Sequence, residues 1–235
     1  MCPARIDLRG PVVVLCEGQH DAAFLHAVAR RIGRADMLDL PFFEQRDGRW
    51  QRRDGFAHGD GAIPGQLRSI AAELTLSPRD AQRVTRLLIL LDCGENAAAT
   101  LGDAASACRK ARVAEPQKVG DWTAAETAPR TAVLLLPPDR ETGSLESVCL
   151  AYLRAAYPQQ AACMDDYFAC LGPPHPVPTA ENQAKARLAA MIAAIRPRNP
   201  TQTLSGAFDG SAPLIDVGHA IFAPFTEAFS ALLAF

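Results

Sequence analysis

Three runs of mostly apolar residues restrict most strongly how this chain can fold. They cover residues 12–16 (VVVLC), 84–91 (VTRLLILL) and 131–136 (TAVLLL). Continuous apolar runs, as opposed to alternating ones, are typical of parallel strands that are covered on both faces. The sequence therefore predicts an α/β protein with a mostly parallel sheet flanked by helices.

Helical spacing of apolar residues separates and follows these runs. It covers residues 21–32, 63–76, 96–112 and 144–156, and Gly33 ends the first of these helices. Between the first two helices, QRDGRWQRRDG contains two Asp-Gly pairs, which are typical of turns around a short ribbon. Strands that alternate with helices imply right-handed crossover connections.

The sequence changes in character at Pro158. Further helices are predicted at 160–171, 180–195 and about 218–235, with a stiff Pro-rich connector at 173–178. The chain has 235 residues, of which 49% are apolar, so it can bury a sizeable core. We expect a single domain over 1–235, with an α/β core at 1–157 and a helical C-terminal portion at 158–235 packed on it.

Charge and hydropathy restrict the possible partners. The formal net charge is −2 and the pI is about 6.2, so any contact with nucleic acid must depend on a local basic patch. No apolar stretch reaches the roughly 18 to 20 residues of a membrane helix, and the start MCPARIDLRG has no apolar signal-peptide region. We expect a cytoplasmic protein without a membrane partner.

The seven cysteines form no CxxC pair and have no histidine at zinc-site spacing. Free cysteine is among the most buried residue types. Reduced and mostly buried thiols are therefore expected.

Acidic residues follow all three apolar runs. Glu17 and Asp21 come after the first, Asp92 after the second, and Glu146 after the third. In open α/β sheets, ligands bind beyond the carboxyl ends of the strands, so these acids are expected to converge if the strands are neighbours. Clustered carboxylates repel one another and require a cation, and their hard oxygens favour Mg²⁺, Mn²⁺ or Ca²⁺.

Helix capping is the alternative explanation for each acid taken separately. Glu17 and Asp21 lie near a predicted helix N-terminus, Asp92 precedes another helix, and Glu146 lies in the first turn of a third. His20, between the first two acids, is interpreted as a helix-turn residue, with metal ligation as its alternative. Because all three runs end in the same way, a shared metal site is the preferred interpretation.

The order of these motifs resembles the Toprim domain, and within it the OLD-type nuclease-like branch. The resemblance lies in E-G-x-x-D at Glu17, Gly18 and Asp21, in the strand that ends at Asp92, and in G-x-L-E ending at Glu146. The stretch LLPPDRETGSLE and the KARL segment at Lys185 are similar to small stand-alone Toprim-like proteins.

The resemblance implies a Toprim-like, Rossmann-like fold and a function. It implies that Glu17, Asp21, Asp92 and Glu146 hold Mg²⁺ or Mn²⁺, that Glu17 is also a general acid or base, and that Lys185 stabilises transition-state charge. The alternative for Lys185 is an ordinary surface lysine. The implied activity is metal-dependent cleavage of phosphodiesters in nucleic acid. An ATPase protein is an implied partner, since the chain itself has no P-loop and no dinucleotide-binding fingerprint.

One departure from the family pattern affects the expected activity. The second motif is usually D-x-D, whereas this chain reads Asp92, Cys93, Gly94. Glu95 is the nearest replacement ligand, and Asp103 is a weaker one. A degenerate, non-catalytic Toprim protein with a binding or regulatory role is therefore the alternative to a nuclease.

The predicted ribbon carries a basic segment with one aromatic residue. Arg46, Arg49, Arg52 and Arg53 surround Trp50. Such a segment is typical of a loop that contacts phosphates and stacks on bases. The alternative is a solvated hairpin with ordinary surface arginines.

Overall fold

The structure is a computed structural model that describes residues 6–47, 49–53, 62–124, 126, 129–172, 179–210 and 213–234. The predicted connector at 173–178 and the second Asp-Gly turn of the ribbon lie outside the described residues. Within the described part of the chain, no helix is long and apolar enough to cross a membrane.

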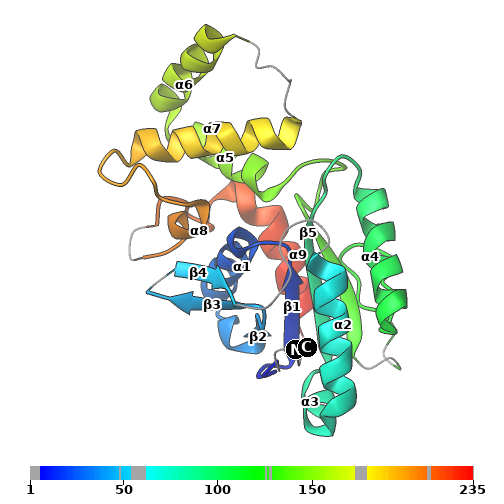
Figure 1. Cartoon of the computed structure of the whole chain (residues 1–235). Helices are drawn as coiled ribbons and strands as arrows, with labels where there is room; N and C mark the ends of the chain where they lie inside the picture. The colour runs from blue at the N-terminus through cyan, green and yellow to red at the C-terminus, as the bar shows by residue number, and fades with distance from the viewer. Residues whose placement is uncertain are drawn as a thin grey trace.

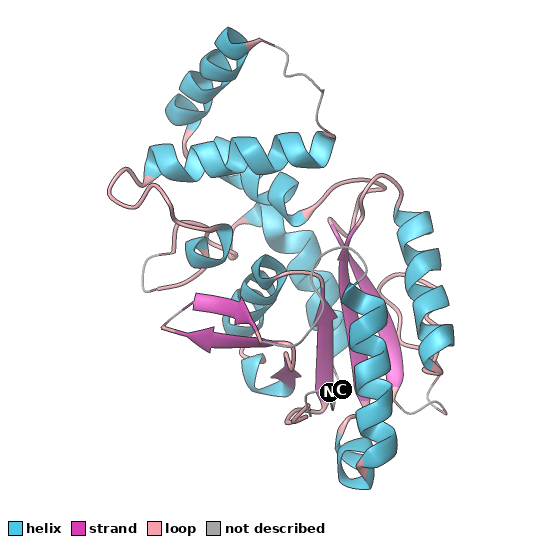
Figure 2. Ribbon diagram, in the orientation of Figure 1, coloured by secondary structure: helices cyan, strands magenta, loops and turns pink. Residues whose placement is uncertain are grey.

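A parallel four-stranded sheet forms the centre of the molecule (Figures 1 and 2). Its strands are β1 (Val12–Cys16), β2 (Leu38–Asp39), β5 (Arg86–Asp92) and β6 (Arg130–Leu136), in the order β2-β1-β5-β6. The three apolar runs thus form adjacent parallel strands, and their central residues are fully buried. The prediction of an α/β fold with a parallel sheet flanked by helices is confirmed.

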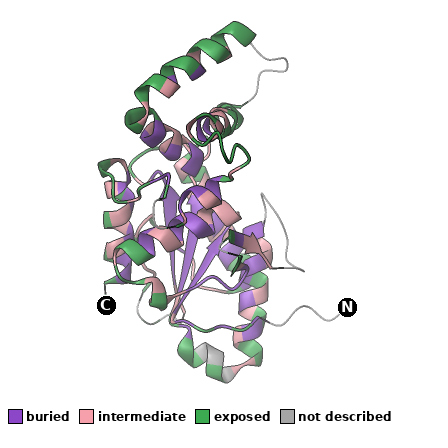
Figure 3. Ribbon diagram, turned by 90° about the vertical axis from the view of Figure 1, so that its left-hand side faces the viewer, coloured by how far each residue is buried: buried purple, intermediate pink, exposed green. Residues whose placement is uncertain are grey.

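Helices cover both faces of this sheet. The helices α2 (Ala62–Leu76) and α4 (Ala97–Ala111) pack together on one face, with α3 (Pro78–Arg83) at the end of α2. The helices α1 (Gln19–Arg31) and α9 (Ala223–Leu233) lie on the other face. Figure 3 shows the buried strands between helices that are buried on one side and exposed on the other.

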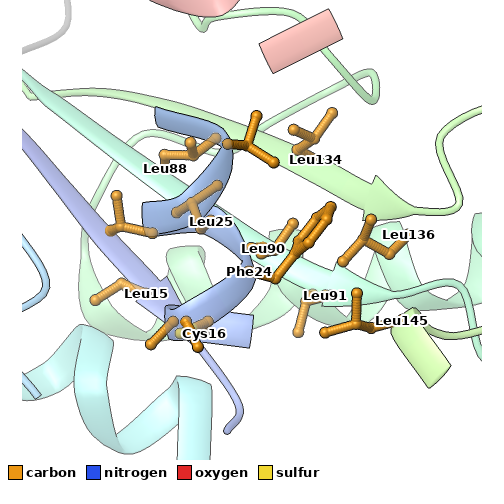
Figure 4. Close-up of a cluster of buried hydrophobic side chains, with 14 of the residues drawn as sticks. Leu15, Cys16, Phe24, Leu25, Leu88, Leu90, Leu91, Leu134, Leu136 and Leu145 are labelled. Atoms are coloured by element: carbon orange, nitrogen blue, oxygen red, sulfur yellow. The ribbon is translucent and has the colours of Figure 1, made fainter. Parts of the chain in front are cut away.

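Phe24 of α1 joins the sheet to the C-terminal helix. Its ring centroid lies 4.8 Å from that of Phe225 in α9 and 5.5 Å from that of Phe208. Figure 4 shows Phe24 among the leucine side chains of the strands. Truncating a phenylalanine buried in this way costs about 3 to 5 kcal/mol.

The remaining helices lie beyond the carboxyl ends of the strands (Figure 1). They are α5 (Leu145–Ala156), α6 (Pro158–Leu171), α7 (Ala180–Ile195) and α8 (Leu204–Ala207). The helices α5, α6 and α7 pack against one another, and α6 is largely exposed (Figure 3). Cys163 and Cys170 lie exposed on α6, so the expectation of burial is wrong for these two thiols and correct for Cys16, Cys93, Cys108 and Cys149.

The last helix is shorter than its apolar pattern predicts. The expected range was 218–235, but α9 begins at Ala223, after the short 3₁₀ helix η2 (Ala220–Phe222). Before it, the amide of Gly218 donates to the carboxylate of Asp216 in a local turn. That side-chain bond offers the backbone an alternative to the helical one, and the start of the helix is delayed.

The predicted ribbon is present as an antiparallel hairpin of β3 (Phe43–Arg46) and β4 (Arg49–Arg52). It lies beside α1, with Trp50 against His26 at a ring-centroid distance of 5.0 Å. Asp47, in the turn, has a φ of +50°, a left-handed conformation that aspartate tolerates better than most residues. A second short 3₁₀ helix, η1 (Ala35–Met37), leads into β2.

Candidate functional site

A pocket of about 640 Å³ lies beyond the carboxyl ends of β1 and β5. One side, which we call the acidic floor, consists of Glu17, Asp21, Asp92 and Glu146. The opposite side, which we call the α7 roof, consists of Glu181, Lys185, Leu188, Ala189 and Ile192 of α7 with residues 200–204. The structure therefore brings together the four acids of the three strand ends, and Lys185 faces them across the pocket.

The turn between β1 and α1 carries Glu17 and Asp21. Gly18 is the N-cap of α1 and has no side chain to cap it, so the carboxylate of Asp21 accepts the Gly18 amide at 2.8 Å. The capping explanation for Asp21 is thus correct, and it coexists with a position in the pocket. Capping fixes Asp21 in one conformation, which suits a ligand-binding group.

Two neighbouring elements hold this turn from outside. The side-chain amide of Gln66 in α2 donates to the Cys16 carbonyl at 2.9 Å. The guanidinium of Arg52 in β4 donates to the Glu17 carbonyl. The backbone on both sides of the Cys16–Glu17 bond is therefore fixed by the hairpin and by α2.

Asp92 lies at the end of β5 and accepts the backbone amide of Leu145 at 2.8 Å. It contacts the N-terminus of α5, while the next helix in sequence, α4, is capped by Asn96. The expectation that Asp92 caps the following helix is therefore wrong, because the parallel order of the sheet places the α5 N-terminus beside it.

Glu146 occupies the first turn of α5. Ser144 and Ser147 form the capping box of this helix. They fill the capping positions, so Glu146 is left as a buried acid on the pocket wall. Its placement follows from the S-x-x-S spacing, in which the residue two positions after the cap projects from the first turn.

Burial and mutual repulsion raise the pKa values of two acids of the floor, Asp21 and Asp92. Burial, with smaller contributions from the charges of Glu146 and Glu17, raises the pKa of Asp21 to about 7, although the Gly18 hydrogen bond opposes this shift. Burial and the charge of Asp21 raise the pKa of Asp92 to about 8, against the hydrogen bond from Leu145. Both acids therefore hold protons near neutral pH, and the floor is short of positive charge.

Lys185 is a cationic group on the opposite side. It is about half exposed and ion-paired with Glu181 one turn earlier in α7. Desolvation lowers its pKa, but the Glu181 hydrogen bond and the charges of Glu146 and Asp92 outweigh that effect and leave the pKa raised. Lys185 is thus an ammonium at neutral pH.

His20 also lines the pocket, in the first turn of α1. Burial lowers its pKa, Glu146 opposes this shift and Lys185 adds to it. The helix-turn position expected for His20 is confirmed. The lowered pKa favours the neutral imidazole at neutral pH, in which form it can act as a hydrogen-bonding group.

The donor set of the floor suits a hydrated Mg²⁺ or Mn²⁺. Carboxylate oxygens are the ligands that these ions prefer, and a cation would relieve the repulsion that raises the pKa values of Asp21 and Asp92. In the described part of the chain, no three His, Cys, Asp or Glu side chains are grouped closely enough to hold a metal ion. Mg²⁺ keeps several waters and is commonly held by one or two carboxylates, so the set fits such an ion without forming a closed cage.

Glu95 and Asp103 lie apart from this cluster. Both side chains are exposed, and neither is among the described residues that line the pocket. Gly94 adopts a φ of +61° and forms a two-hydrogen-bond bridge with Gly143, at 3.0 and 2.9 Å. The bridge turns the chain before Glu95, so this glutamate does not supply the acid that the Toprim resemblance led us to expect at position 94.

Gly143 requires the absence of a side chain. Its φ is +131°, and a Cβ placed there would lie 2.9 Å from Cδ of Pro137. The glycine of the G-x-L-E motif thus has a steric role next to the pocket.

The basic hairpin has only partly the surface expected of a nucleic-acid-binding loop. Trp50 is 9% exposed and packs on α1, so it is a core residue and the prediction of base stacking by it is wrong. Arg49 is exposed, and Arg46 is paired with Glu44 at 2.5 Å. The remaining two arginines bind backbone carbonyls: Arg53 that of Phe43, and Arg52 that of Glu17.

The α7 roof contains residues that the sequence did not identify. Glu181 and residues 200–204 line the pocket. The stretch after α7 has no periodicity, and its approach to the strand ends depends on the packing of α5, α7 and α8. Its Thr-x-Thr-Leu pattern is the one local signal, since Thr203 caps α8.

A family model described as "Protein of unknown function (DUF3226)" matches residues 11–234, which include the whole sheet, the acidic floor and the α7 roof. No curated protein and no solved structure matches the chain.

Proposed function

The chain belongs to the DUF3226 family, and we propose that it is a Toprim-like, OLD-type enzyme that cleaves phosphodiesters in nucleic acid with Mg²⁺ or Mn²⁺. One observation carries this proposal. Four carboxyl groups from three strand ends line one pocket with an ammonium opposite them. Carboxylates with strongly perturbed pKa values in a pocket are typical of functional sites.

The residues of the pocket have distinct roles in this proposal. One or two of the acids Asp21, Asp92 and Glu146 would hold a hydrated divalent cation, which when bound neutralises phosphate charge and lowers the pKa of a bound water. Glu17, whose backbone is fixed by Arg52, acts as the general acid or base. The ammonium of Lys185 stabilises negative charge that develops on the phosphate.

The hairpin supplies positive charge beside the pocket. Arg52 reaches the backbone of Glu17, and Arg46, Arg49 and Arg53 lie on the same two-stranded element or directly after it. Phosphate contacts of this kind orient a nucleic acid without reading its sequence. We assign this role to the arginines and exclude Trp50 from it, because Trp50 is buried.

A non-catalytic binding or regulatory function is the second candidate. It is favoured by Gly94, which occupies the position of the second aspartate in the Toprim D-x-D motif. The backbone of Gly94 is hydrogen-bonded to Gly143. The lack of a compact three-ligand group among the described residues favours it as well. For both candidate functions we propose that the protein works in a reducing compartment, the cytoplasm, because the six described cysteines are free. We also propose an ATPase protein as its partner.

The test is a cleavage assay with purified protein. Single- and double-stranded DNA and RNA are incubated with Mg²⁺ or Mn²⁺, with the Glu17→Ala variant and, as a matched control, Glu95→Ala. Glu95 is an exposed acid outside the described pocket lining. We expect cleavage by the wild type and Glu95→Ala, and a loss of at least about 100-fold in Glu17→Ala.

Two outcomes contradict the nuclease proposal. Equal cleavage by Glu17→Ala and the wild type assigns the activity to another site or to a contaminant. No cleavage with either ion, together with Mn²⁺ binding that Asp92→Asn abolishes, assigns the chain to the non-catalytic candidate.

A further inference from the structure

The pocket is larger than a metal site requires. Its volume of about 640 Å³ lies within the roughly 300 to 1,000 Å³ of pockets that hold whole organic ligands. A hydrated ion would occupy only the part of the pocket next to the acidic floor. The rest of the volume lies against the α7 roof and is available to a second group.

The α7 roof has a different chemistry from the floor. Leu188, Ala189 and Ile192 line the pocket from one face of α7 and form an apolar strip, in which Ala189 is exposed and Leu188 and Ile192 are each 2% exposed; Pro200 and Leu204 extend it from the following segment. Lys185 lies on the same face, and the seven residues from it to Ile192 span about 10 Å along the helix. The pocket thus changes from ionic to apolar along one direction.

Polar side chains border this apolar strip. Thr201, Gln202 and Thr203 lie between Pro200 and Leu204 in the sequence and also line the pocket. The amide nitrogen of Gln202 donates to the Gly206 carbonyl at 2.9 Å, and the Thr203 hydroxyl caps α8. These bonds fix the positions of an amide and a hydroxyl beside an apolar surface, an arrangement that suits a flat heteroaromatic ring with polar edges better than an alkyl chain.

We infer that the pocket binds a single nucleoside phosphate, with its phosphate between the acidic floor and Lys185 and its base against Leu188, Ala189 and Ile192. The inference deepens the proposed function, on which its metal-bound phosphate rests. A base pair of an intact duplex does not fit, because one unit must leave the stack to enter a pocket of this volume. The ligand is therefore a free nucleotide or the unpaired end of a strand.

The apolar strip can be blocked without altering the floor. Ala189 is an exposed residue of α7 that lines the pocket, and Ala186 is an exposed residue of the same helix that is not among the described lining residues. Ala189→Trp fills the apolar end, and Ala186→Trp is the matched control. Thermal melts establish that both variants are folded.

Calorimetric titration with adenosine 5′-monophosphate in the presence of Mn²⁺ tests the base site, and electron paramagnetic resonance of Mn²⁺ alone tests the floor. We expect the wild type and Ala186→Trp to bind the nucleotide alike, and Ala189→Trp to bind it at least tenfold more weakly while binding Mn²⁺ equally well. Equal nucleotide binding by the two variants overturns the inference, as does inorganic phosphate that binds as tightly as the nucleotide. If neither the wild type nor the two variants bind Mn²⁺, but the wild type and Ala186→Trp still bind the nucleotide, the proposed function is contradicted and the base site is supported.

Competition by oligonucleotides distinguishes the two sources of the ligand. If a short unpaired oligonucleotide displaces the nucleotide, the ligand is a strand end. If it does not, while the direct binding remains, the ligand is a free nucleotide. Displacement by a blunt-ended hairpin as strong as that by the unpaired strand overturns the exclusion of duplexes.

Discussion

The acidic floor and the α7 roof face the same pocket but have opposite effects on the stability of the fold. The floor buries carboxyl groups whose pKa values rise because burial and neighbouring charges disfavour ionisation. The roof is an ordinary amphipathic helix that buries Leu188 and Ile192 and leaves Lys185 half exposed. The second arrangement stabilises the fold and the first costs stability, so the floor is where we expect function to have been favoured over stability.

The largest effect is expected from neutralising one acid of the floor. Asp92→Asn keeps the acceptor for the Leu145 amide but removes the charge, and should lower phosphodiester cleavage by at least about 100-fold. Asp103→Asn, on the exposed side of α4, should leave cleavage unchanged. Steady-state kinetics with both variants measures this difference, and an equal loss in Asp103→Asn would show that the floor is not the site.

The same Asp92→Asn variant should be more stable than the wild type when no divalent ion is added. The folded pKa of about 8 lies above the ordinary value of 3.8, so the folded protein binds this proton more tightly than the unfolded chain does. The contribution of Asp92 to stability is therefore fully present below pH 4 and is lost as the pH rises from about 4 to about 8.

Denaturant unfolding at several pH values measures this effect. We expect the free energy of unfolding of Asp92→Asn to exceed that of the wild type by roughly 1 to 3 kcal/mol at pH 8, and the difference to shrink towards pH 4. A variant that is less stable than the wild type at pH 8 would mean that the carboxylate of Asp92 is well solvated or paired. The floor would then not destabilise the fold, and it would not differ from the roof in this respect.

A smaller effect is expected from the roof. Lys185→Ala removes a half-exposed ammonium, whose contribution is reduced by solvent, and should lower cleavage about tenfold. Lys185→Arg should retain most of the activity because it keeps the charge. If Lys185→Ala lowers cleavage as much as Asp92→Asn does, Lys185 is as important for the reaction as the acids of the floor.

The smallest effect is expected from Glu181→Gln. Glu181 and Lys185 form an i,i+4 pair whose side chains are 44% and 47% exposed. Pairs of this kind contribute only a few tenths of a kcal/mol to stability. The free energy of unfolding measured by chemical denaturation should therefore change by less than about 0.5 kcal/mol. A larger loss would indicate that the pair organises the α7 roof.

The sheet and the acidic floor could be predicted because both follow from local rules. Buried parallel strands have continuous apolar sequences. The residue after such a strand lies at the carboxyl-end edge of the sheet, where ligands bind. Glu17 and Asp92 line the pocket for this reason, whereas Glu146 reaches it from the first turn of α5, after the loop that follows β6. Lys185 was found only through a resemblance, since a lysine on a helix has no local signal that distinguishes the pocket from solvent.

Trp50 shows where local pattern fails. A basic segment with one aromatic residue looks the same whether the ring faces solvent or the core, and in a hairpin the side chains of successive residues point to opposite faces. Packing beside α1 places Trp50 against His26, while Arg49 on the opposite face is exposed. The contact depends on how the hairpin docks, which is a tertiary property.

The bridge between Gly94 and Gly143 restricts how the site can be rebuilt by protein engineering or by evolution. A Cβ at position 94 would have the Thr100 hydroxyl as its nearest neighbour, at 3.9 Å, and Thr100 belongs to α4, outside the described pocket lining. An aspartate introduced there would start out towards α4 and not towards Asp92. A single codon change at position 94 therefore does not place a further acid in the pocket, because the path of the backbone would have to change with the side chain.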